Sequence, residues 1–508
     1  MRGPRARGRA PVVLAVFAAL SACSVGPDFK PPASPAGAGF TTTALPGTTD
    51  ASAAIGGEAQ RFAIGHDIQA DWWTLFRSAA LDSLVQQAFK ANPNIDSARS
   101  ALVQAQENVS AQQGYFFPTA SASYQFQRQQ LAGNLSGNAP GQQGNGTFIG
   151  GSPNKPAIFN FHTAQLTVGY TPDVFGGNRR AVESLQAQAD NQRFMLEASY
   201  ITLASNVVAA ALQEASIRAQ LDAMRTIVRG NEESLDILQK QLRAGYATRI
   251  DVAAQEAALA QAKAMVPPLE KQFEQTRDLI RALVGNLPNQ DVSETFDLAG
   301  LHLPEDLPVS LPSKLIEQRP DVQAAEAQMH AASADVGVAI AAMLPQFNIT
   351  GAGGGAATQF AQMFSSGGPF WSLATGLTQP LFDGFTLLHR KRAAEQALVQ
   401  AQAQYRGTVI AAFQNVADTL HALVSDASAL AAAADAEQAA TVTLDLTRRQ
   451  SQDGYVPYLA LLSAQQAYQT ALATRVQAQA TRFGDTAALY QALGGGWWHR
   501  EEQKTAIR

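Results

Sequence analysis

The sequence has very little cysteine: Cys23 is the only one among its 508 residues. A single thiol excludes an intrachain disulfide, so the fold must depend on packing and hydrogen bonding. Cys23 follows four arginines within the first nine residues, an apolar stretch from Val12 to Leu20, and two small residues. This order predicts a secretory signal over residues 1–22. The apolar stretch is too short for a membrane-spanning helix, which needs about 20 apolar residues.

Charged side chains are also scarce. They make up 16% of the chain, and the net charge is −5. No basic run follows the signal, which argues against a nucleic-acid partner. The seven histidines are scattered without an HExxH pair, and no P-loop or GxSxG motif occurs. We therefore predict no enzyme, no metal site and no cofactor.

Long apolar runs are absent from the rest of the chain, so no transmembrane helix is expected there. A chain without such helices can enter a membrane only as a β-barrel, because only helices and closed barrels satisfy the backbone in lipid. Residues 23–70 are rich in Pro, Gly, Ala and Thr and show no periodicity. They predict an extended N-terminal strap.

The chain contains an internal repeat. Asn92-Pro93 opens a helical run that stops at Phe117-Pro118, and Arg319-Pro320 opens another that stops at Leu344-Pro345. Both landmarks recur 227 residues later (320 − 93 and 345 − 118). Duplicated units of this size predict one symmetric wall rather than two independent domains. We place the first repeat at 71–310, the second at 311–494 and a tail at 495–508.

Four segments alternate apolar and polar residues, which predicts strands with one apolar face. They cover 119–128, 158–172, 346–355 and 370–382. A barrel needs at least about 8 strands, so four cannot close one. The pattern favours an oligomer whose copies each donate four strands. A small soluble sheet with one solvated face is the alternative.

Long helices are expected between and after the strands. Residues 177–243 contain no proline and carry a 3-4 apolar spacing that is broken only by Asn231. The spacing involves Ile217, Leu221, Met224, Val228, Leu235, Leu238 and Leu242. A helix of this length reaches roughly 100 Å at 1.5 Å per residue. A short helix is expected from Trp72 to Phe89. The other helices are expected at 93–114, 249–283, 320–343, 384–453 and 457–493.

At this point the residues resemble the TolC/OprM-like outer-membrane efflux family, in its lipoprotein (NodT-like) branch. The resemblance covers Cys23-Ser24-Val25-Gly26-Pro27-Asp28-Phe29, Ala70-Asp71-Trp72-Trp73, both repeats and Ala492-Leu493-Gly494-Gly495-Gly496-Trp497. It implies an α+β membrane protein: a homotrimer with a 12-stranded β-barrel, four strands per chain, continuous with a 12-helix periplasmic α-barrel. It also implies a passive duct for small-molecule efflux, joined through a periplasmic adaptor to an inner-membrane RND-type transporter.

Leu20-Ser21-Ala22-Cys23 is similar to a lipobox, the signal that directs acylation of a bacterial lipoprotein. The expected modification of Cys23 is a diacylglycerol and an N-acyl chain. Each buried CH₂ of such chains contributes about 0.8 kcal/mol, so a multiply acylated terminus holds firmly to a membrane. Ser24 favours sorting to the outer membrane. An ordinary signal with a chance cysteine is the alternative.

Two turns match the family's adaptor-contact positions: Ala244-Gly245-Tyr246 and Asp453-Gly454-Tyr455. A glycine there also suits any helical hairpin, because it permits φ > 0. The periplasmic aperture of the family maps to Leu459, Ala460, Ser463 and Asp251. Family members often carry an Asp at the positions of Ala460 and Ser463, and this chain departs from that pattern. Leu459 matches the hydrophobic ring residue of some members, so the resemblance implies an apolar constriction with weak cation binding. Asp251 also fits a capping box with Thr248.

Two other functions remain open: a type I protein-secretion exit channel and a lipid-anchored structural coiled-coil protein of the periplasm. The second explains the helical seams but not the four amphipathic strands. Ion conductance separates a duct from a spacer.

Overall fold

The computed structural model describes residues 24–33, 39–131 and 157–500. The expected signal at 1–22, the expected lipidation site Cys23 and the end of the expected tail lie outside the described residues. The chain divides into two compact units. Unit 1 comprises Met1–Lys30, Gln104–Ala189 and Gln328–Ala401, and unit 2 comprises Pro31–Val103, Asp190–Ala327 and Gln402–Arg508.

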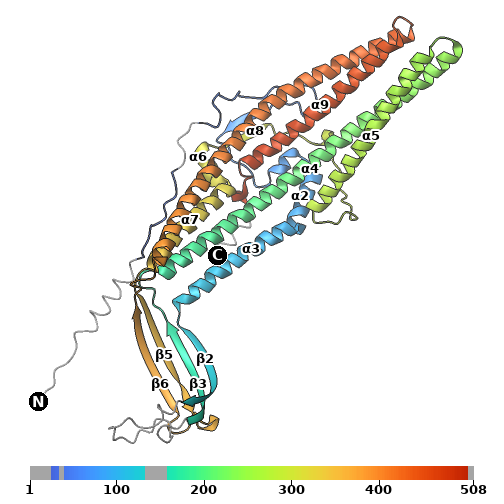
Figure 1. Cartoon of the computed structure of the whole chain (residues 1–508). Helices are drawn as coiled ribbons and strands as arrows, with labels where there is room; N and C mark the ends of the chain where they lie inside the picture. The colour runs from blue at the N-terminus through green and yellow to red at the C-terminus, as the bar shows by residue number, and fades with distance from the viewer. Residues whose placement is uncertain (1–23, 34–38, 132–156, 501–508) are drawn as a thin grey trace, which may run out of the picture. The chain divides into compact units, whose positions relative to one another are not determined.

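Unit 1 contains an antiparallel four-stranded sheet, of order β2-β3-β5-β6. The strands are β2 (Thr119–Leu131), β3 (Ala157–Tyr170), β5 (Gln346–Ala357) and β6 (Pro369–Thr378) (Figure 1). The expectation that the last strand reaches residue 382 is wrong. It ends before Gln379-Pro380, because proline has no N–H to donate to a strand ladder.

The register of this sheet places the apolar side chains of neighbouring strands on one face. Tyr124 lies opposite Ala164, Ala122 opposite Leu166, and Leu166 in turn opposite Gly353, which pairs with Trp371. Serine, threonine and glutamine occupy most of the intervening positions. Alternation along each strand therefore becomes alternation across the whole sheet.

The long helices lie within two residues of their expected ends. They are α3 (Pro93–Gln113), α4 (Gly177–Ala244), α5 (Arg249–Leu283), α7 (Pro320–Ala341), α8 (Thr386–Gln452) and α9 (Tyr458–Ala492). Among the described residues, α4 alone contains an 18-residue stretch apolar enough to cross a membrane. Because 67% of that stretch is buried inside the chain, it has the character of a core helix.

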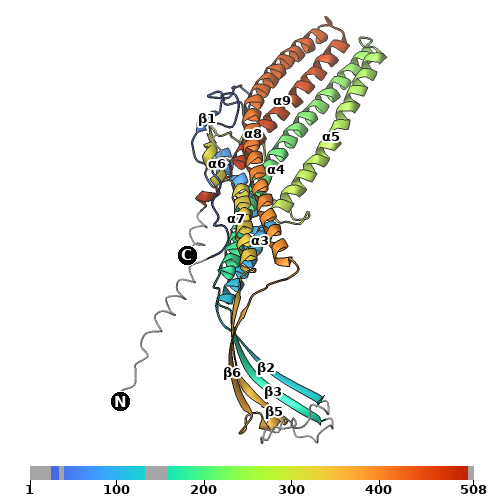
Figure 2. The same cartoon turned by 60° about the vertical axis from the view of Figure 1, so that its left-hand side comes forward.

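α4 and α8 begin in unit 1 and continue through unit 2, where α4 and α5 form one hairpin and α8 and α9 form a second (Figures 1 and 2). The apolar side chains that share one face of α8 are buried: Val416, Leu420, Leu423 and Leu430. Ile217, Leu221 and Leu238 of α4 are buried too. Each hairpin is thus held along its length by burial of one apolar stripe.

The single helix expected from Trp72 to Phe89 is two helices instead. A 3-10 helix spans Trp72–Phe76, and α2 follows at Ala79–Ala91. Arg77 between them has φ 54°, in the left-handed region, which no α-helix accommodates. Ser78 then caps α2, its Oγ accepting a hydrogen bond from Leu81 N.

A small sheet and a short helix in unit 2 were not expected. Strand β1 (Arg61–Ile64) pairs in parallel with β4 (Asp306–Val309), and α6 (Pro312–Gln318) follows. Residues 23–70 are therefore not extended strap throughout, since β1 belongs to a sheet. Strands of four residues show too few alternations to reveal a period.

An aromatic cluster fills the core of unit 2 near these elements. The ring of Trp72 stacks on that of Tyr490 with centroids 5.2 Å apart, and Phe76 lies 6.3 Å from Phe483. All four side chains are almost fully buried. Trp73 Nε1 donates to Asp82 Oδ1 at 3.0 Å, so its one polar atom is satisfied.

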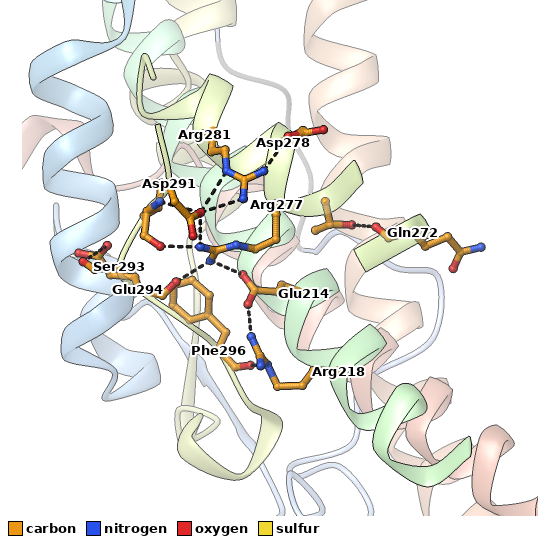
Figure 3. Close-up of polar contacts among 12 residues, drawn as sticks. Glu214, Arg218, Gln272, Arg277, Asp278, Arg281, Asp291, Ser293, Glu294 and Phe296 are labelled. Carbon is orange, nitrogen blue, oxygen red and sulfur yellow. Dashed lines mark hydrogen bonds and ion pairs between the residues drawn. The ribbon is translucent and has the colours of Figure 1, made fainter. Parts of the chain in front are cut away.

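A network of charges fixes the segment that follows α5 (Figure 3). The buried Arg277 donates to Glu214 Oε2 at 3.2 Å, to Glu294 O at 2.6 Å and to Asp291 Oδ1 at 2.8 Å. Arg218 donates to Glu214 Oε1 at 2.6 Å and to Phe296 O at 2.9 Å. The fully buried Glu214 is therefore paired on both oxygens.

Candidate functional site

Both hairpin turns use the same backbone arrangement. Gly245 and Gly454 have φ 81° and 79°. Tyr246 N donates to Gln241 O at 2.8 Å, and Tyr455 N donates to Gln450 O at 2.8 Å. These are the long hydrogen bonds of a Schellman motif with glycine in the left-handed position. The glycines are therefore required by turn geometry.

The residue after each glycine is an exposed aromatic. Tyr246 is 86% exposed and Tyr455 is 81% exposed. Ala244 ends α4, and Asp453 precedes the second glycine; both are exposed as well. Two rings held outward on rigid turns are the kind of contact surface that protein partners bind, because tyrosine offers large area with few rotatable bonds.

Asp251 forms the capping box that its sequence pattern suggested. Its Oδ2 accepts from Thr248 N at 2.9 Å, and Asp251 N donates to Thr248 Oγ1 at 3.2 Å. The hydrogen bonds from the Thr248 hydroxyl and backbone N–H lower the pKa of Asp251. This carboxylate thus has a local structural role at the start of α5.

The three positions on α9 that the resemblance assigns to an aperture lie at the beginning of this helix. Leu459 is 65% exposed, although Leu461 and Leu462 beside it are buried. Ser463 is exposed one turn later, and its hydroxyl donates to Leu459 O at 3.0 Å. Ala460 is half-buried. The helix therefore presents an isolated leucine and a satisfied hydroxyl, with no acidic side chain among the three.

A buried polar contact between the two hairpins was missed by the sequence reasoning. Gln255 of α5 is fully buried, and its Nε2 donates to Asn231 O at 2.8 Å and to Asn231 Oδ1 at 3.0 Å. Tyr458 of α9 donates its hydroxyl to Gln255 Oε1. Burial, followed by the negative charge of Asp251, raises the pKa of Tyr458 to about 12. The hydroxyl is therefore a proton donor at any physiological pH.

This contact sets the position of Leu459. Tyr458 directly precedes Leu459, so the hydrogen bond to Gln255 fixes the first turn of α9 against the first hairpin. Leu444, Leu461 and Ala464 form an apolar cluster beside it. The sequence did carry a signal, because Asn231 was the single break in the apolar spacing of its helix.

The residues after Cys23 are held against unit 1. Val25 N donates to Phe175 O at 3.2 Å, and Arg180 donates to Val25 O at 3.0 Å and to Asp28 Oδ1 at 2.7 Å. Phe29 stacks on His330 with centroids 4.3 Å apart. The described segment from residue 25 to residue 29 is thus held by hydrogen bonds and a ring contact. In the described parts of the chain, no group of three or more His, Cys, Asp or Glu could hold a metal.

Comparison with known proteins identifies the family. The outer membrane efflux protein model matches residues 84–286 and 311–495. The pyoverdine export outer membrane protein OpmQ of Pseudomonas putida is 29% identical, covering 84% of this chain and 88% of that protein. The toluene efflux pump outer membrane protein TtgF of Pseudomonas putida is 28% identical, covering 95% and 96%.

Solved structures agree. The outer-membrane channel OprN superposes with a TM-score of 0.79 at 25% identity, covering 94% of this chain and 100% of that one. The Campylobacter jejuni channel CmeC gives a TM-score of 0.81 at 19% identity, covering 96% and 98%, and so shares the fold. The chain therefore belongs to the outer membrane efflux protein family and is an exit duct for efflux in the outer membrane.

Proposed function

We propose that three copies of this chain close into one duct: a 12-stranded β-barrel in the outer membrane, continuous with a 12-helix periplasmic tunnel. The open sheet of unit 1 carries this proposal. Within the described residues β2 pairs only with β3, and β6 pairs only with β5, so both edges are unpaired. Lipid forbids unpaired edges, and four strands are too few to close alone.

The faces of that sheet support a position in lipid. Trp371 is 80% exposed, Leu373 is 69% exposed, and Tyr124 and Leu166 on the neighbouring strands of the same face are also exposed. A soluble protein rarely leaves so many large apolar side chains in contact with water. In the proposed trimer this face meets lipid, and the face with serine, threonine and glutamine lines the water-filled interior.

The helices and turns support a proposal for the periplasmic partners. Each chain would supply four helical columns to the tunnel, two from each copy of the sequence repeat. The exposed Tyr246 and Tyr455, with Ala244, Gly245, Asp453 and Gly454, would contact a periplasmic adaptor that couples the duct to an inner-membrane RND-type transporter. We infer small-molecule cargo, because relatives are named for pyoverdine export and toluene efflux. Protein secretion remains the second candidate.

At the aperture, we assign the constriction to Leu459. Its exposure in the single chain leaves it free to meet its two symmetry copies, while Ala460 and Ser463 contribute no charge to the opening. Tyr458 holds this turn in the closed position through Gln255 and Asn231. Asp251 supports the same region by capping α5.

We propose that Cys23 carries diacylglycerol and an N-acyl chain that anchor the N-terminus in the outer membrane. The clamp formed by Arg180 on Val25 and Asp28 supports this assignment, because it gives the anchored segment a fixed attachment to unit 1. Metabolic labelling with a radioactive fatty acid tests it. Wild type should incorporate label, and Cys23→Ala should not.

Cross-linking between strand edges tests the trimer. Ser123→Cys on β2 combined with Ser372→Cys on β6 places one thiol at each free edge. A flexible bis-maleimide should then join chains into dimers and trimers on a denaturing gel. As a matched control, Thr167→Cys with Ala352→Cys places the thiols on β3 and β5, which pair within one chain at that position. Edge thiols that link only within one chain would overturn the proposal.

Planar-bilayer recording and cargo assays separate the alternatives. A duct conducts ions, whereas a lipid-anchored spacer does not. A deletion strain should gain susceptibility to small toxic compounds and retain its secreted proteins. Loss of one secreted protein with unchanged susceptibility would favour the secretion channel instead.

A further inference from the structure

The segment of unit 1 between β6 and α8 carries an apolar cluster on its surface. Leu381, Phe382 and Phe385 are all exposed, and the two phenylalanine rings lie edge to face with centroids 5.9 Å apart. Phe385 has φ 66°, and Arg77 is the only other described non-glycine residue with a positive φ. A residue with a Cβ adopts this conformation only at an energetic cost, so the turn that exposes the Phe385 ring is strained.

Cationic side chains follow in the first two turns of α8. Arg390 and Arg392 are exposed, and neither forms an ion pair with a residue that the structure describes. His389 N donates to Phe385 O at 3.0 Å, so the helical hydrogen-bond pattern already includes Phe385. Positions 385, 389 and 392 therefore share one face of the helix, at i, i+4 and i+7. The apolar cluster is thus continued along the helix by positive charge.

The acids nearest in sequence are engaged elsewhere. Asp383 Oδ2 accepts a hydrogen bond from Leu387 N at 2.7 Å, and Glu395 pairs with Lys391 at 3.4 Å. The three consecutive cations at 390–392 are also shorter than the basic tracts of about 5–8 residues that mark nucleic-acid binding. The two exposed arginines thus remain available to an anion of another kind.

The first copy of the sequence repeat shows an equivalent junction that is covered. Phe175-Gly176-Gly177 lies 207 residues before Phe382-Asp383-Gly384 (382 − 175). Val25 N donates to Phe175 O at 3.2 Å, and a Cβ on Gly177 would lie 3.0 Å from Ala341 Cβ. A Cβ on Gly384 would meet no heavy atom within 4 Å. The N-terminal segment therefore packs on the first junction, whereas no described residue packs on the second at Gly384.

The arginines at the beginnings of the two long helices differ in the same way. Arg180 of α4 is buried and donates to Asp28 Oδ1 and to Glu183 Oε2, both at 2.7 Å. Arg390 and Arg392 of α8 have no such acid among the described residues. The charge of the first copy is therefore neutralised within the chain, and that of the second is presented to the surroundings.

We propose that this junction site, which we define as Leu381, Phe382, Phe385, Arg390 and Arg392, binds an anionic phospholipid of the periplasmic leaflet. The apolar side chains pack on its acyl chains, and the two guanidinium groups donate hydrogen bonds to its phosphate. A zwitterionic lipid binds less well, because its ammonium group adds positive charge beside the arginines.

This inference rests on the proposed position of the sheet in the outer membrane. Strand β6 ends at Thr378, three residues before the site, and its exposed Trp371, Leu373 and Leu377 belong to the face assigned to lipid. Arg392 lies about 10 Å along the helix from Phe385, at 1.5 Å per residue. Helical side chains tilt toward the N-terminus, which is the sheet end of α8. The arginines can thus reach lipid headgroups while the rings lie at the edge of the hydrocarbon.

Native mass spectrometry of the full-length protein in detergent tests the proposal. Dioleoyl phosphatidylglycerol is the probe, and dioleoyl phosphatidylcholine, with the same acyl chains, is the zwitterionic comparison. Wild type should retain more phosphatidylglycerol. Arg390→Gln with Arg392→Gln should lower that retention about tenfold and leave phosphatidylcholine unchanged. Arg406→Gln with Arg449→Gln, a matched control that removes two exposed charges farther along α8, should behave as wild type.

A second pair of substitutions tests the apolar part of the site. Phe382→Ala with Phe385→Gly removes both rings, and glycine keeps the turn because it adopts φ > 0 without strain. Retention of both lipids should fall. An excess of sodium phosphate should not displace phosphatidylglycerol, because the free ion has no acyl chains to fill the apolar cluster.

Several outcomes would overturn the inference. They are equal retention of the two lipids by wild type, an equal loss in the control pair, or displacement by phosphate. If the arginine variants dissociate the oligomer in the same spectra with lipid retention unchanged, the site is an interface between copies. A channel that conducts in planar bilayers but shows no lipid preference removes this inference alone. A chain that neither assembles nor conducts contradicts the proposed function itself.

Discussion

The two hairpins of unit 2 have the same kind of turn but begin their return helices differently. In the first, Thr248 and Asp251 form a capping box, so α5 is stabilised by its own residues. In the second, α9 begins after Pro457 with no side-chain cap, and Tyr458 instead bonds to Gln255 of the first hairpin. The first turn is self-sufficient, whereas the second depends on its neighbour. A helix start that lacks a cap of its own and is held by contacts to another hairpin is suited to a moving part.

The C-terminal ends of the two return helices are also stabilised differently. Near the end of α5, the charged side chain of Arg277 lies between those of Glu214 and Asp291. Near the end of α9, the aromatic rings of Phe483 and Tyr490 pack in the core. Apolar burial tolerates changes of pH and salt, whereas an ion network depends on the ionisation of its acids. The comparison can be tested by breaking each contact in turn.

The largest loss of stability is expected at the charged network near the C-terminal end of α5. Arg277→Gln removes the cation between Glu214 and Asp291 and leaves a buried carboxylate with one partner fewer. We expect the free energy of unfolding to fall by about 3 kcal/mol, as measured by thermal unfolding in detergent. Arg225→Gln breaks an exposed pair with Glu270 on the same hairpin and should cost at most about 0.5 kcal/mol.

The same network predicts that the protein loses stability at low pH. Hydrogen bonds from Arg281, followed by those from Arg277, lower the pKa of Asp291 to about 2. Because the folded value is depressed, its contribution is present above about pH 4 and is lost as the pH falls through about 2. Arg277→Gln should weaken this acid dependence. An unchanged acid profile would contradict the assigned role of Asp291.

Breaking the contact between the hairpins should have the next effect. Tyr458→Phe leaves the buried Gln255 Oε1 without a donor, at a cost of about 1–2 kcal/mol. Because this bond fixes the first turn of α9, single-channel conductance in planar bilayers should rise. Tyr468→Phe is a suitable control, since Tyr468 packs on the same apolar cluster. If wild type and Tyr458→Phe conduct equally, the Tyr458 hydroxyl does not hold the first turn of α9 closed.

The capping box should matter for stability alone. Thr248→Ala removes a side-chain cap and should lower the free energy of unfolding by about 1 kcal/mol. Conductance should stay at the wild-type level, because the hydrogen bond from Tyr458 to Gln255 that fixes the start of α9 is left in place. A conductance rise equal to that of Tyr458→Phe would show that the two turns act as one unit.

The smallest change in stability is expected at the aperture residue. Leu459→Ser alters an exposed side chain and should change the free energy of unfolding by no more than about 0.5 kcal/mol. It should nevertheless raise conductance, because a small polar side chain replaces the apolar constriction. Val442→Ser, on an exposed side chain of α8, is a control. Unchanged conductance in Leu459→Ser would contradict the assignment of the constriction to Leu459.

The sequence predicted the long helices and the four strands because each is encoded by a pattern that repeats many times within one segment. It also predicted both glycine turns and the capping box, which depend on fewer than ten consecutive residues. It did not predict the pairing of β1 with β4 or the contact of Tyr458 with Gln255. Asn231 marked one of these sites as a break in a pattern, but a break does not name its partner.

By itself, then, the sequence determined where the chain turns, which faces of its helices and strands are apolar, and that four strands leave an incomplete sheet. The tertiary structure decided which polar groups meet inside the unit that contains both hairpins. The physical reason is the sequence separation of the residues involved, because backbone geometry and amphipathic periodicity depend only on residues that are close together in the chain. Burial of a polar group is favourable only if a partner arrives from another segment, often more than 200 residues away, and packing alone selects that partner.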